Sequence, residues 1–345
     1  MDSLDEELSA FVRRLNMSRS QLQLNPKEEI TSLAMYLDTL YVGTSYSTVL
    51  LVHLNKPEQA NPFAEDGQRS RRSSSSSSRG LSELATVPEL GARVAVCSGK
   101  KRVTGLYVMP ALDTLLVLCD GRLFCLNLAS NEVTTPLKKV RNVDAVAVQG
   151  HANCRSVVVA AKRQLIYLLH EDGRFVRGKE VSLPDAATSL CWRGKHVCVA
   201  LKKRRYILLN IETGECSDLH VPLSGPDDRS VRAQVASVSH DQIILRSAHG
   251  ALFVFLKWDG TLATRAPIEF SSAPLQVVVC GMYLAGVVNS ISDSPSAESQ
   301  SDEVLLDSEG RIEIFSLEDS RMVQSFPFPL PATLWSPTLV TSRDT

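Results

Sequence analysis

Eight cysteines are the first residues to test for chemistry, because thiolates bind zinc and thiols pair as disulfides. They are scattered along the chain, and no two form a Cys-x-x-Cys pair. Most lie inside apolar runs, such as the one from His196 to Ala200. This spacing suits neither a zinc site nor a disulfide framework. We therefore expect reduced thiols that act as small buried apolar groups.

Catalytic motifs are the next candidates. The chain has no complete Gly-x-x-x-x-Gly-Lys-Ser/Thr phosphate loop, no Gly-x-Gly-x-x-Gly fingerprint, no Gly-x-Ser-x-Gly elbow and no His-Glu-x-x-His helix. Asp120-Gly121, Asp172-Gly173 and Asp259-Gly260 offer carboxylates, but Asp-Gly is the dipeptide that tight hairpins require. The acidic stretch from Asp307 to Gly310 lacks the alternating oxygen ligands of a calcium loop. We predict no catalytic, metal-binding or cofactor-binding residues and no cofactor.

Short clusters of lysine and arginine are the residues best suited to recognition. The net charge is only -1, so any electrostatic attraction must be local. Such clusters can bind an acidic protein surface or anionic lipid headgroups, although solvated turns also favour these residues. Nucleic acid is not an expected partner, because only Tyr206 offers a nearby aromatic ring for base stacking. The candidate basic docking patch comprises Lys100, Lys101, Arg102, Lys138, Lys139, Arg141, Lys162, Arg163, Lys202, Lys203, Arg204 and Arg205.

A serine-rich stretch carries a modification signal. Arg69-Ser70-Arg71-Arg72 precedes a serine run, and arginines beside serines suit a basophilic kinase. The stretch buries too little apolar surface to fold, so a tolerated disordered loop insertion is the simpler interpretation. The candidate phosphorylation sites are Ser73, Ser74 and Ser75.

Paired strands are the elements that must position these residues. Short β-branched and aliphatic runs bounded by turn residues recur along the chain, which indicates an all-β protein. Equivalent second strands start at positions separated by about 74, 42, 42, 45 and 60 residues. Removing the insertions at 57–86 and 290–306 brings the two long steps to about 44 and 43. The equivalent starting residues are Val49, Leu123, Leu165, Ile207, Leu252 and Ile312.

A repeat of this size with four strands is typical of one β-propeller blade. We predict about seven four-stranded blades, of which six are clearly visible and the last is incomplete. Two packed β-sandwiches are the alternative. In a propeller, the turn between the second and third strands of a blade lies on the same face as the connection to the next blade. The basic clusters should therefore share one face and one sector of the ring.

The same strands resemble a known family. Leu40 to Thr44, Leu115 to Asp120, Val158 to Arg163, His196 to Leu201 and Ser325 to Phe328 are similar to strands of the citron homology (CNH) domain, as found in vacuolar-sorting tether subunits of the HOPS and CORVET complexes. The resemblance covers about residues 30 to 330. It implies an N-terminal propeller followed by an α-solenoid, and contact with Rab-type GTPases or other tether subunits. The serine-rich insertions and the end of the chain before a solenoid depart from this pattern.

The expected domain organisation follows. Residues 1–24 form an N-terminal helix or closing strand, 25–330 the CNH-type propeller with disordered insertions at 57–86 and 290–306, and 331–345 a tail or partial last blade. Ala10 to Val12 and Leu334 to Val340 are expected to supply strands of a seventh blade that closes the ring. The acidic N-terminus lacks a secretory signal, and the apolar stretch from Pro274 to Val288 is too short to span a bilayer.

Together these expectations give a non-enzymatic interaction module of a vesicle-tethering subunit. It would act in vesicle-mediated and intracellular protein transport, in the cytoplasm and peripherally on endosomal or vacuolar/lysosomal membranes. The expected partners are a Rab-type GTPase or tether-complex subunits, with peripheral contact to anionic membrane. The alternatives are a propeller-type metal-dependent hydrolase and a scaffold in receptor or kinase signalling.

Overall fold

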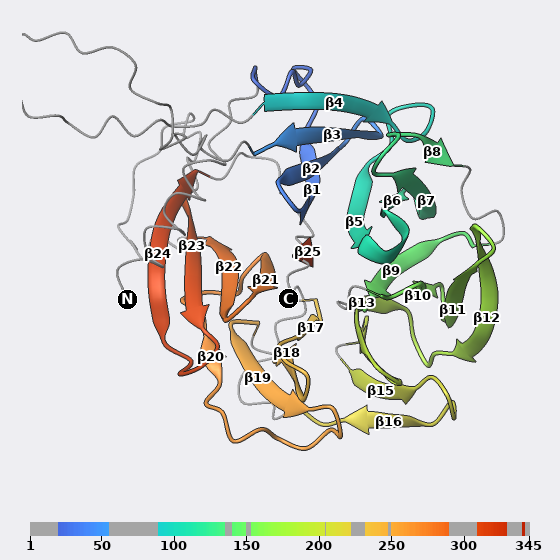
Figure 1. The fold of residues 1–345 in the computed structure, drawn as a ribbon. Coiled ribbons are helices and arrows are strands. Elements are labelled where there is room, and N and C mark those ends of the chain that lie inside the picture. The colour runs from blue at the N-terminus through green and yellow to red at the C-terminus, as the bar shows by residue number, and fades with distance from the viewer. Residues whose placement is uncertain are drawn as a thin grey trace, which may run out of the picture.

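The computed structural model describes residues 20–54, 89–134, 140–149, 153–203, 205–221, 232–247, 250–289, 309–329 and 340–341. These residues form six antiparallel sheets arranged in a ring (Figure 1). Each sheet pairs four strands in chain order, and one also receives a fifth strand. The described part of the chain contains no α-helix, only the short 3-10 turn η1 (Pro110–Leu112).

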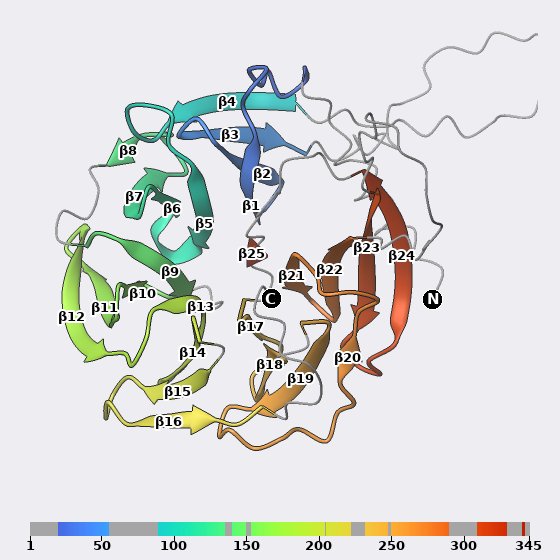
Figure 2. The same ribbon diagram turned by 180° about the vertical axis from the view of Figure 1, so that it is seen from behind.

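Each blade takes four consecutive strands of the chain. Blades 1 to 3 comprise β1 (Ile30–Tyr36), β2 (Thr39–Thr44), β3 (Thr48–His53) and β4 (Glu89–Ala95); β5 (Val103–Met109), β6 (Thr114–Cys119), β7 (Arg122–Asn127) and β8 (Val133–Thr134); and β9 (Val143–Val148), β10 (Ser156–Ala161), β11 (Gln164–Glu171) and β12 (Arg174–Ser182). Blades 4 to 6 comprise β13 (Ala187–Arg193), β14 (His196–Leu201), β15 (Tyr206–Asn210) and β16 (Cys216–Leu219); β17 (Val235–Ser237), β18 (Gln242–Arg246), β19 (Leu252–Lys257) and β20 (Ile268–Glu269); and β21 (Gln276–Cys280), β22 (Tyr283–Asn289), β23 (Glu309–Ser316) and β24 (Met322–Pro329). The first strand of each blade lies nearest the centre of the ring, and the fourth lies at the rim, as the two opposite views show (Figures 1 and 2).

The core consists of one apolar cluster at each junction between consecutive blades. Alternate residues of a strand point to opposite faces of its sheet, and neighbouring blades cover both faces of blades 2 to 5. On β6, Leu115 and Val117 pack toward blade 1, whereas Leu116 and Leu118 pack toward blade 3. The sequence therefore shows continuous apolar runs in the second strands, because such a strand must be apolar on both faces.

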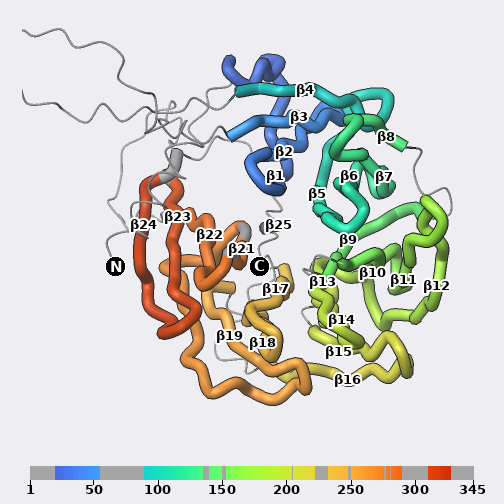
Figure 3. The backbone as a smooth tube through the Cα atoms, viewed as in Figure 1, coloured from blue at the N-terminus to red at the C-terminus, as the bar shows by residue number. Residues whose placement is uncertain are grey.

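Blade 1 has a different environment on its second face. Leu40, Val42, Leu50 and Val52 form a cluster there with Leu22, and the residues of this cluster come from blade 1 and the segment just before it. The fifth strand, β25 (Val340–Thr341), pairs in parallel with β1. It lies at the centre of the ring and also contacts β5 and β21 (Figure 3).

The innermost strands of blades 1 to 4 share a bulge. The register shifts at Thr31, Thr104, Asp144 and Thr188, each the second residue of its strand. Two of these side chains connect neighbouring blades. The Thr31 hydroxyl donates to the carbonyl of Val103 at 2.5 Å, and that of Thr188 donates to the carbonyl of Ala233 at 2.8 Å. A bulge leaves its residue free of the strand ladder, so its side chain can serve this second role.

The structure confirms the all-β propeller of four-stranded blades and the six blades that are visible in the sequence. Within the described residues there are six blades, and the last has all four strands. The expected seventh blade is not among them, and Val340, which was assigned to it, joins blade 1 through β25 instead. Residues 1–19, 55–88, 290–308 and 330–339 lie outside the described residues, and so do Ala10 to Val12, Ser73, Ser74, Ser75 and the whole of both insertions.

The described thiols are free. Cys119, Cys154, Cys191 and Cys198 are buried as expected, whereas Cys216 is exposed on the rim strand β16. Exposure at Cys216 follows from its position on an outermost strand, because no further strand covers that edge.

Candidate docking surface

The turns between the second and third strands and the connections between blades lie on one face of the ring, because consecutive strands run antiparallel. We call this face the basic face. Nine of the twelve predicted cations are described, and the topology places all of them on it. Lys100, Lys101 and Arg102 connect β4 to β5, Arg141 precedes β9, Lys162 and Arg163 form the β10–β11 turn, and Lys202, Lys203 and Arg205 lie between β14 and β15. Lys138, Lys139 and Arg204 lie outside the described residues.

In blade 1, Ser47 fixes the loop that carries the first cluster. Ser47 is fully buried, and its hydroxyl oxygen lies 2.8 Å from the carbonyl of Gly99 and 3.0 Å from that of Lys101, while accepting the Lys101 N–H at 2.8 Å. One serine thus holds both ends of a short loop. Lys100 Nζ then sits 4.7 Å from the centre of the Tyr46 ring, a cation–π contact.

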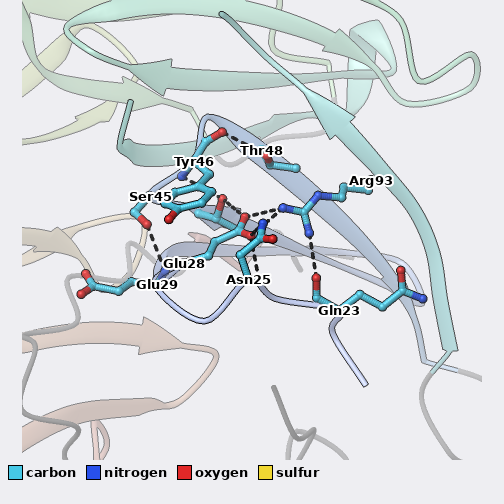
Figure 4. A network of polar contacts seen from close by, with 9 residues as sticks. Gln23, Asn25, Glu28, Glu29, Ser45, Tyr46, Thr48 and Arg93 are labelled. Atoms are coloured by element: carbon cyan, nitrogen blue, oxygen red, sulfur yellow. Dashed lines mark hydrogen bonds and ion pairs between the residues drawn. The ribbon is translucent and has the colours of Figure 1, made fainter. Parts of the chain in front are cut away.

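Blade 1 also has a buried carboxylate, and Figure 4 shows its polar contacts. Glu28 is fully buried, and both its oxygens accept hydrogen bonds from Arg93, at 2.7 and 2.6 Å. Thr44 donates to it at 2.7 Å, and Asn25 donates through its backbone N–H and its side-chain amide. Burial alone would raise the pKa of Glu28, but these hydrogen bonds outweigh it and hold the pKa below the ordinary value of a glutamate.

The Glu28 network joins three segments that are distant in sequence. Arg93 from β4 also donates to the carbonyl of Gln23 at 3.0 Å. The segment before β1 is thereby held to blade 1, with Leu22 in the apolar cluster of that blade. The nearby Glu29 N–H bonds the Ser45 hydroxyl at 3.0 Å, which fixes the start of the β2–β3 turn.

Two of the predicted cations are paired with acids on the same face. Lys101 Nζ lies 3.2 Å from Asp120 Oδ2, and Arg205 binds both oxygens of Asp218, at 2.8 and 2.7 Å. All four side chains are about half exposed, so each pair contributes little stability. The Lys101–Asp120 pair nevertheless ties the β4–β5 connection to the β6–β7 turn of blade 2.

Other cations extend from this face without an ion pair among the described residues. Lys162 adopts a left-handed backbone with φ of 58° and uses its backbone N–H to bond Asp144 Oδ2 at 3.0 Å. Its side chain is exposed, as are those of Lys202 and Lys203. Arg163 donates to the carbonyl of Pro184 in the next connection. Three exposed lysines of the basic face, Lys162, Lys202 and Lys203, thus lie on blades 3 and 4.

A groove opens beside these lysines at the junction of blades 3 and 4. It has a volume of about 460 Å³ and an open mouth. Leu183, Pro184 and Ile207 line it with apolar atoms, and the Arg205–Asp218 pair borders it. A groove with a mixed apolar and polar lining and a charged border can accept a side chain of a protein partner.

Arg246 is a buried charged residue on the basic face that the sequence did not single out. It is buried at the end of β18 on the basic face, and its guanidinium donates to the carbonyls of Gly250 and Pro274, both at 2.7 Å. The Tyr206 hydroxyl donates to the backbone carbonyl of Arg246 at 2.6 Å. These bonds connect blades 4, 5 and 6. The available signal was an arginine directly after the apolar run of β18, where a buried cation needs several acceptors.

The described residues show no group of three or more His, Cys, Asp or Glu side chains placed to hold a metal ion. Asp120 and Gly121 both have positive φ, 51° and 65°, as a tight hairpin turn requires. Gly173 to Lys179 has the glycine and lysine spacing of a phosphate loop, but Glu180 follows, and almost all of the stretch lies in the extended strand β12. No helix among the described residues has the length and apolar character needed to cross a membrane.

Comparison with known proteins places the chain in a family. The CNH domain family matches residues 90–291, more than half of the chain. The chain belongs to the CNH domain family. In the solved structure titled "AfRom2 CNH domain", a similar fold aligns with a TM-score of 0.53, covering 88% of this chain and 85% of that one at 12% identity. That likeness supports the shared fold.

Two curated relatives bear on function. The Transforming growth factor-beta receptor-associated protein 1 homolog of Danio rerio is 29% identical over 246 residues, which is 66% of this chain and 28% of the relative. Vacuolar sorting protein 39 of Arabidopsis thaliana is 24% identical over 186 residues, 53% of this chain and 17% of that protein. The chain therefore spans less than a third of the length of these relatives.

Proposed function

We propose that this CNH propeller is a non-enzymatic docking module of a vesicle-tethering subunit, and that its basic face binds an acidic protein partner of the Rab-type GTPase class or another tether subunit. The observation that carries the proposal is the set of exposed lysines on blades 3 and 4, Lys162, Lys202 and Lys203, beside a groove with a charged border. Charges around an interface steer association. The groove would supply the buried contact that slows dissociation of the complex.

The family and the vacuolar-sorting relative support the cellular setting of this proposal. A protein of this kind would act in the cytoplasm, peripherally on endosomal or vacuolar membranes, in intracellular protein transport. The exposed lysines would then face a membrane-bound partner, with anionic lipid around it adding to the attraction.

The test compares two double variants, each of which reverses two charges on one face of the ring. In the full chain, Lys202→Glu with Lys203→Glu changes the basic face, and Lys195→Glu with Lys257→Glu makes the same change in net charge on the opposite face. All four lysines are exposed and form no salt bridge among the described residues. Circular dichroism and thermal unfolding should show both variants folded.

Binding is then measured against purified Rab-type GTPases, loaded with GDP or a GTP analogue, and tether subunits. The basic-face variant should lose about tenfold in affinity at low salt, and the difference should shrink as salt is raised. Equal binding by the two variants would contradict the proposed surface. Loss of binding to phosphoinositide vesicles only, with protein binding unchanged, would contradict the protein partner and assign the surface to lipid.

A scaffold in receptor signalling is the second candidate function. The observation that favours it is the name of the Danio rerio relative, which associates that protein with a growth factor receptor. Capture of a receptor cytoplasmic domain by the full chain, with no capture of GTPases or tether subunits, would support this candidate over the first.

A further inference from the structure

Two cysteines from different blades lie in contact beneath the first basic cluster. Cys97 follows β4 in blade 1, and Cys119 ends β6 in blade 2. Their sulfur atoms are 3.6 Å apart. Both belong to the apolar cluster at the junction of blades 1 and 2, and 21 residues separate them in the chain. Their proximity therefore depends on the packing of the two blades.

The two thiols differ in access to solvent. Cys97 is partly exposed, and the residues that follow it, from Ser98 to Lys100, are exposed. Cys119 is fully buried. Burial raises the pKa of Cys119 to about 12, Cys97 adds to this rise, and a hydrogen bond with Ser47 opposes it. A small oxidant should therefore react first at Cys97, since the thiolate is the nucleophile and Cys119 is held as a thiol.

We propose that Cys97 and Cys119 form an oxidative modification site, at which a hydroperoxide converts the two thiols into a disulfide between blades 1 and 2. The Cys97 thiolate attacks the peroxide oxygen, and the O–O bond breaks to give a sulfenic acid and hydroxide. The Cys119 sulfur then attacks the sulfenic sulfur, and the displaced hydroxide takes the thiol proton and leaves as water. In total two thiols and one hydrogen peroxide give one disulfide and two waters, so the thiols lose two electrons that the peroxide gains.

The remaining movement is small. The sulfurs must approach by about 1.6 Å to reach bonding distance. Cys97 lies at the start of the loop from 97 to 102, in which Ser47 holds Gly99 and Lys101. A shift of the loop start toward blade 2 brings Cys97 to Cys119 without breaking the sheets. The disulfide would lock the loop that carries Lys100, Lys101 and Arg102.

The experiment treats the purified full chain with a few equivalents of hydrogen peroxide, blocks free thiols at low pH and maps tryptic peptides without reduction. The expected product joins the peptide of residues 94–100 to that of residues 103–122, two hydrogen atoms lighter than their sum. Reduction should separate the pair. Oxidation should also slow amide hydrogen exchange in residues 97–102 and raise the melting temperature by roughly 5 °C.

Three comparisons make the result decisive. Cys97→Ser should leave Cys119 fully reduced, because peroxide does not reach a buried thiol. Cys119→Ala should instead trap Cys97 as a sulfenic acid that dimedone labels. Cys191 on β13 and Cys198 on β14 lie opposite each other in the sheet, and both are buried. They should stay reduced in every sample.

Several outcomes would overturn the inference. These are the absence of the 94–100 to 103–122 product in a sample whose exposed Cys216 has been oxidised, the preferential pairing of Cys97 with Cys216 of another molecule, and oxidation of Cys119 in the Cys97→Ser variant. None of these readouts requires a binding partner, so the inference and the proposed function stand or fall separately.

Discussion

Replacing Glu28 with glutamine tests whether the buried carboxylate holds the start of the chain to blade 1. Glu28→Gln keeps the shape of the side chain but removes the charge that Arg93, Thr44 and Asn25 bond. The substitution also replaces one carboxylate oxygen by an NH₂ group, which then faces other hydrogen-bond donors. Charge-assisted hydrogen bonds each contribute about 1.5–3 kcal/mol, and the remaining carbonyl retains part of this.

The Arg93 side chain is 32% exposed, so water screens part of the ion pair. We therefore expect the free energy of unfolding to fall by about 2–3 kcal/mol, a decrease in melting temperature of roughly 6 °C. Amide exchange in residues 20–36 should accelerate first, because Asn25 loses its carboxylate partner and Arg93, which also bonds Gln23, loses its ion pair. Urea unfolding gives the free energy, and exchange with mass spectrometry gives the location.

The effect should depend on pH with a definite sign. The pKa of Glu28 is lower in the folded protein than in the unfolded chain, so its stabilisation is complete above the unfolded value of about 4.3. It is lost as the pH falls below that value and through the folded pKa. The stability difference between wild type and Glu28→Gln should therefore shrink from pH 7 toward pH 3.

Glu29→Gln is the matched control, because it makes the same chemical change one residue away, on a side chain that forms no ion pair among the described residues. It should change stability by less than about 0.5 kcal/mol at any of these pH values. If Glu28→Gln matches this control at pH 7, or if its effect grows in acid, the assigned network is wrong.

Three further substitutions test the supports of the ring. Ser47→Ala removes the hydroxyl that holds the first basic loop; it should cost about 1–3 kcal/mol and accelerate exchange in residues 97–102 but not in 202–205. Tyr206→Phe removes the bond between blades 4 and 5 and should lower the free energy of unfolding in urea by about 1–2 kcal/mol, and an unchanged free energy would contradict that bond. Gly43→Ala would place a Cβ 2.6 Å from Val103 Cγ1, and overpacking should cost about 1–3 kcal/mol. Gly173→Ala meets no atom within 4 Å, so it should show only the cost of its positive φ, about 1 kcal/mol; a Gly43→Ala variant that melts at the wild-type temperature would contradict the close packing at Gly43.

The sequence alone predicted the blades, because the signals that define them are local. An apolar run such as Leu115 to Leu118 must be covered on both faces, and a turn such as Asp120-Gly121 must follow it. The spacing of the second strands gave the repeat, and the strand order gave the shared face of the basic turns. Each of these inferences uses residues that are neighbours in the chain.

The tertiary structure decided which distant residues meet. Glu28 with Arg93 and Cys97 with Cys119 depend on how one segment or blade packs against the next. The strand at Val340 shows the same point, since its pairing with blade 1 rather than with a blade of its own depends on an edge more than 300 residues away. Period and turn chemistry carry no information on these contacts, because the contacts follow from the radius of the ring and the stacking of its sheets. The sequence therefore determined the repeating unit and the positions of its charges, and only the packed ring determined the buried acid, the thiol pair and the groove beside the lysines.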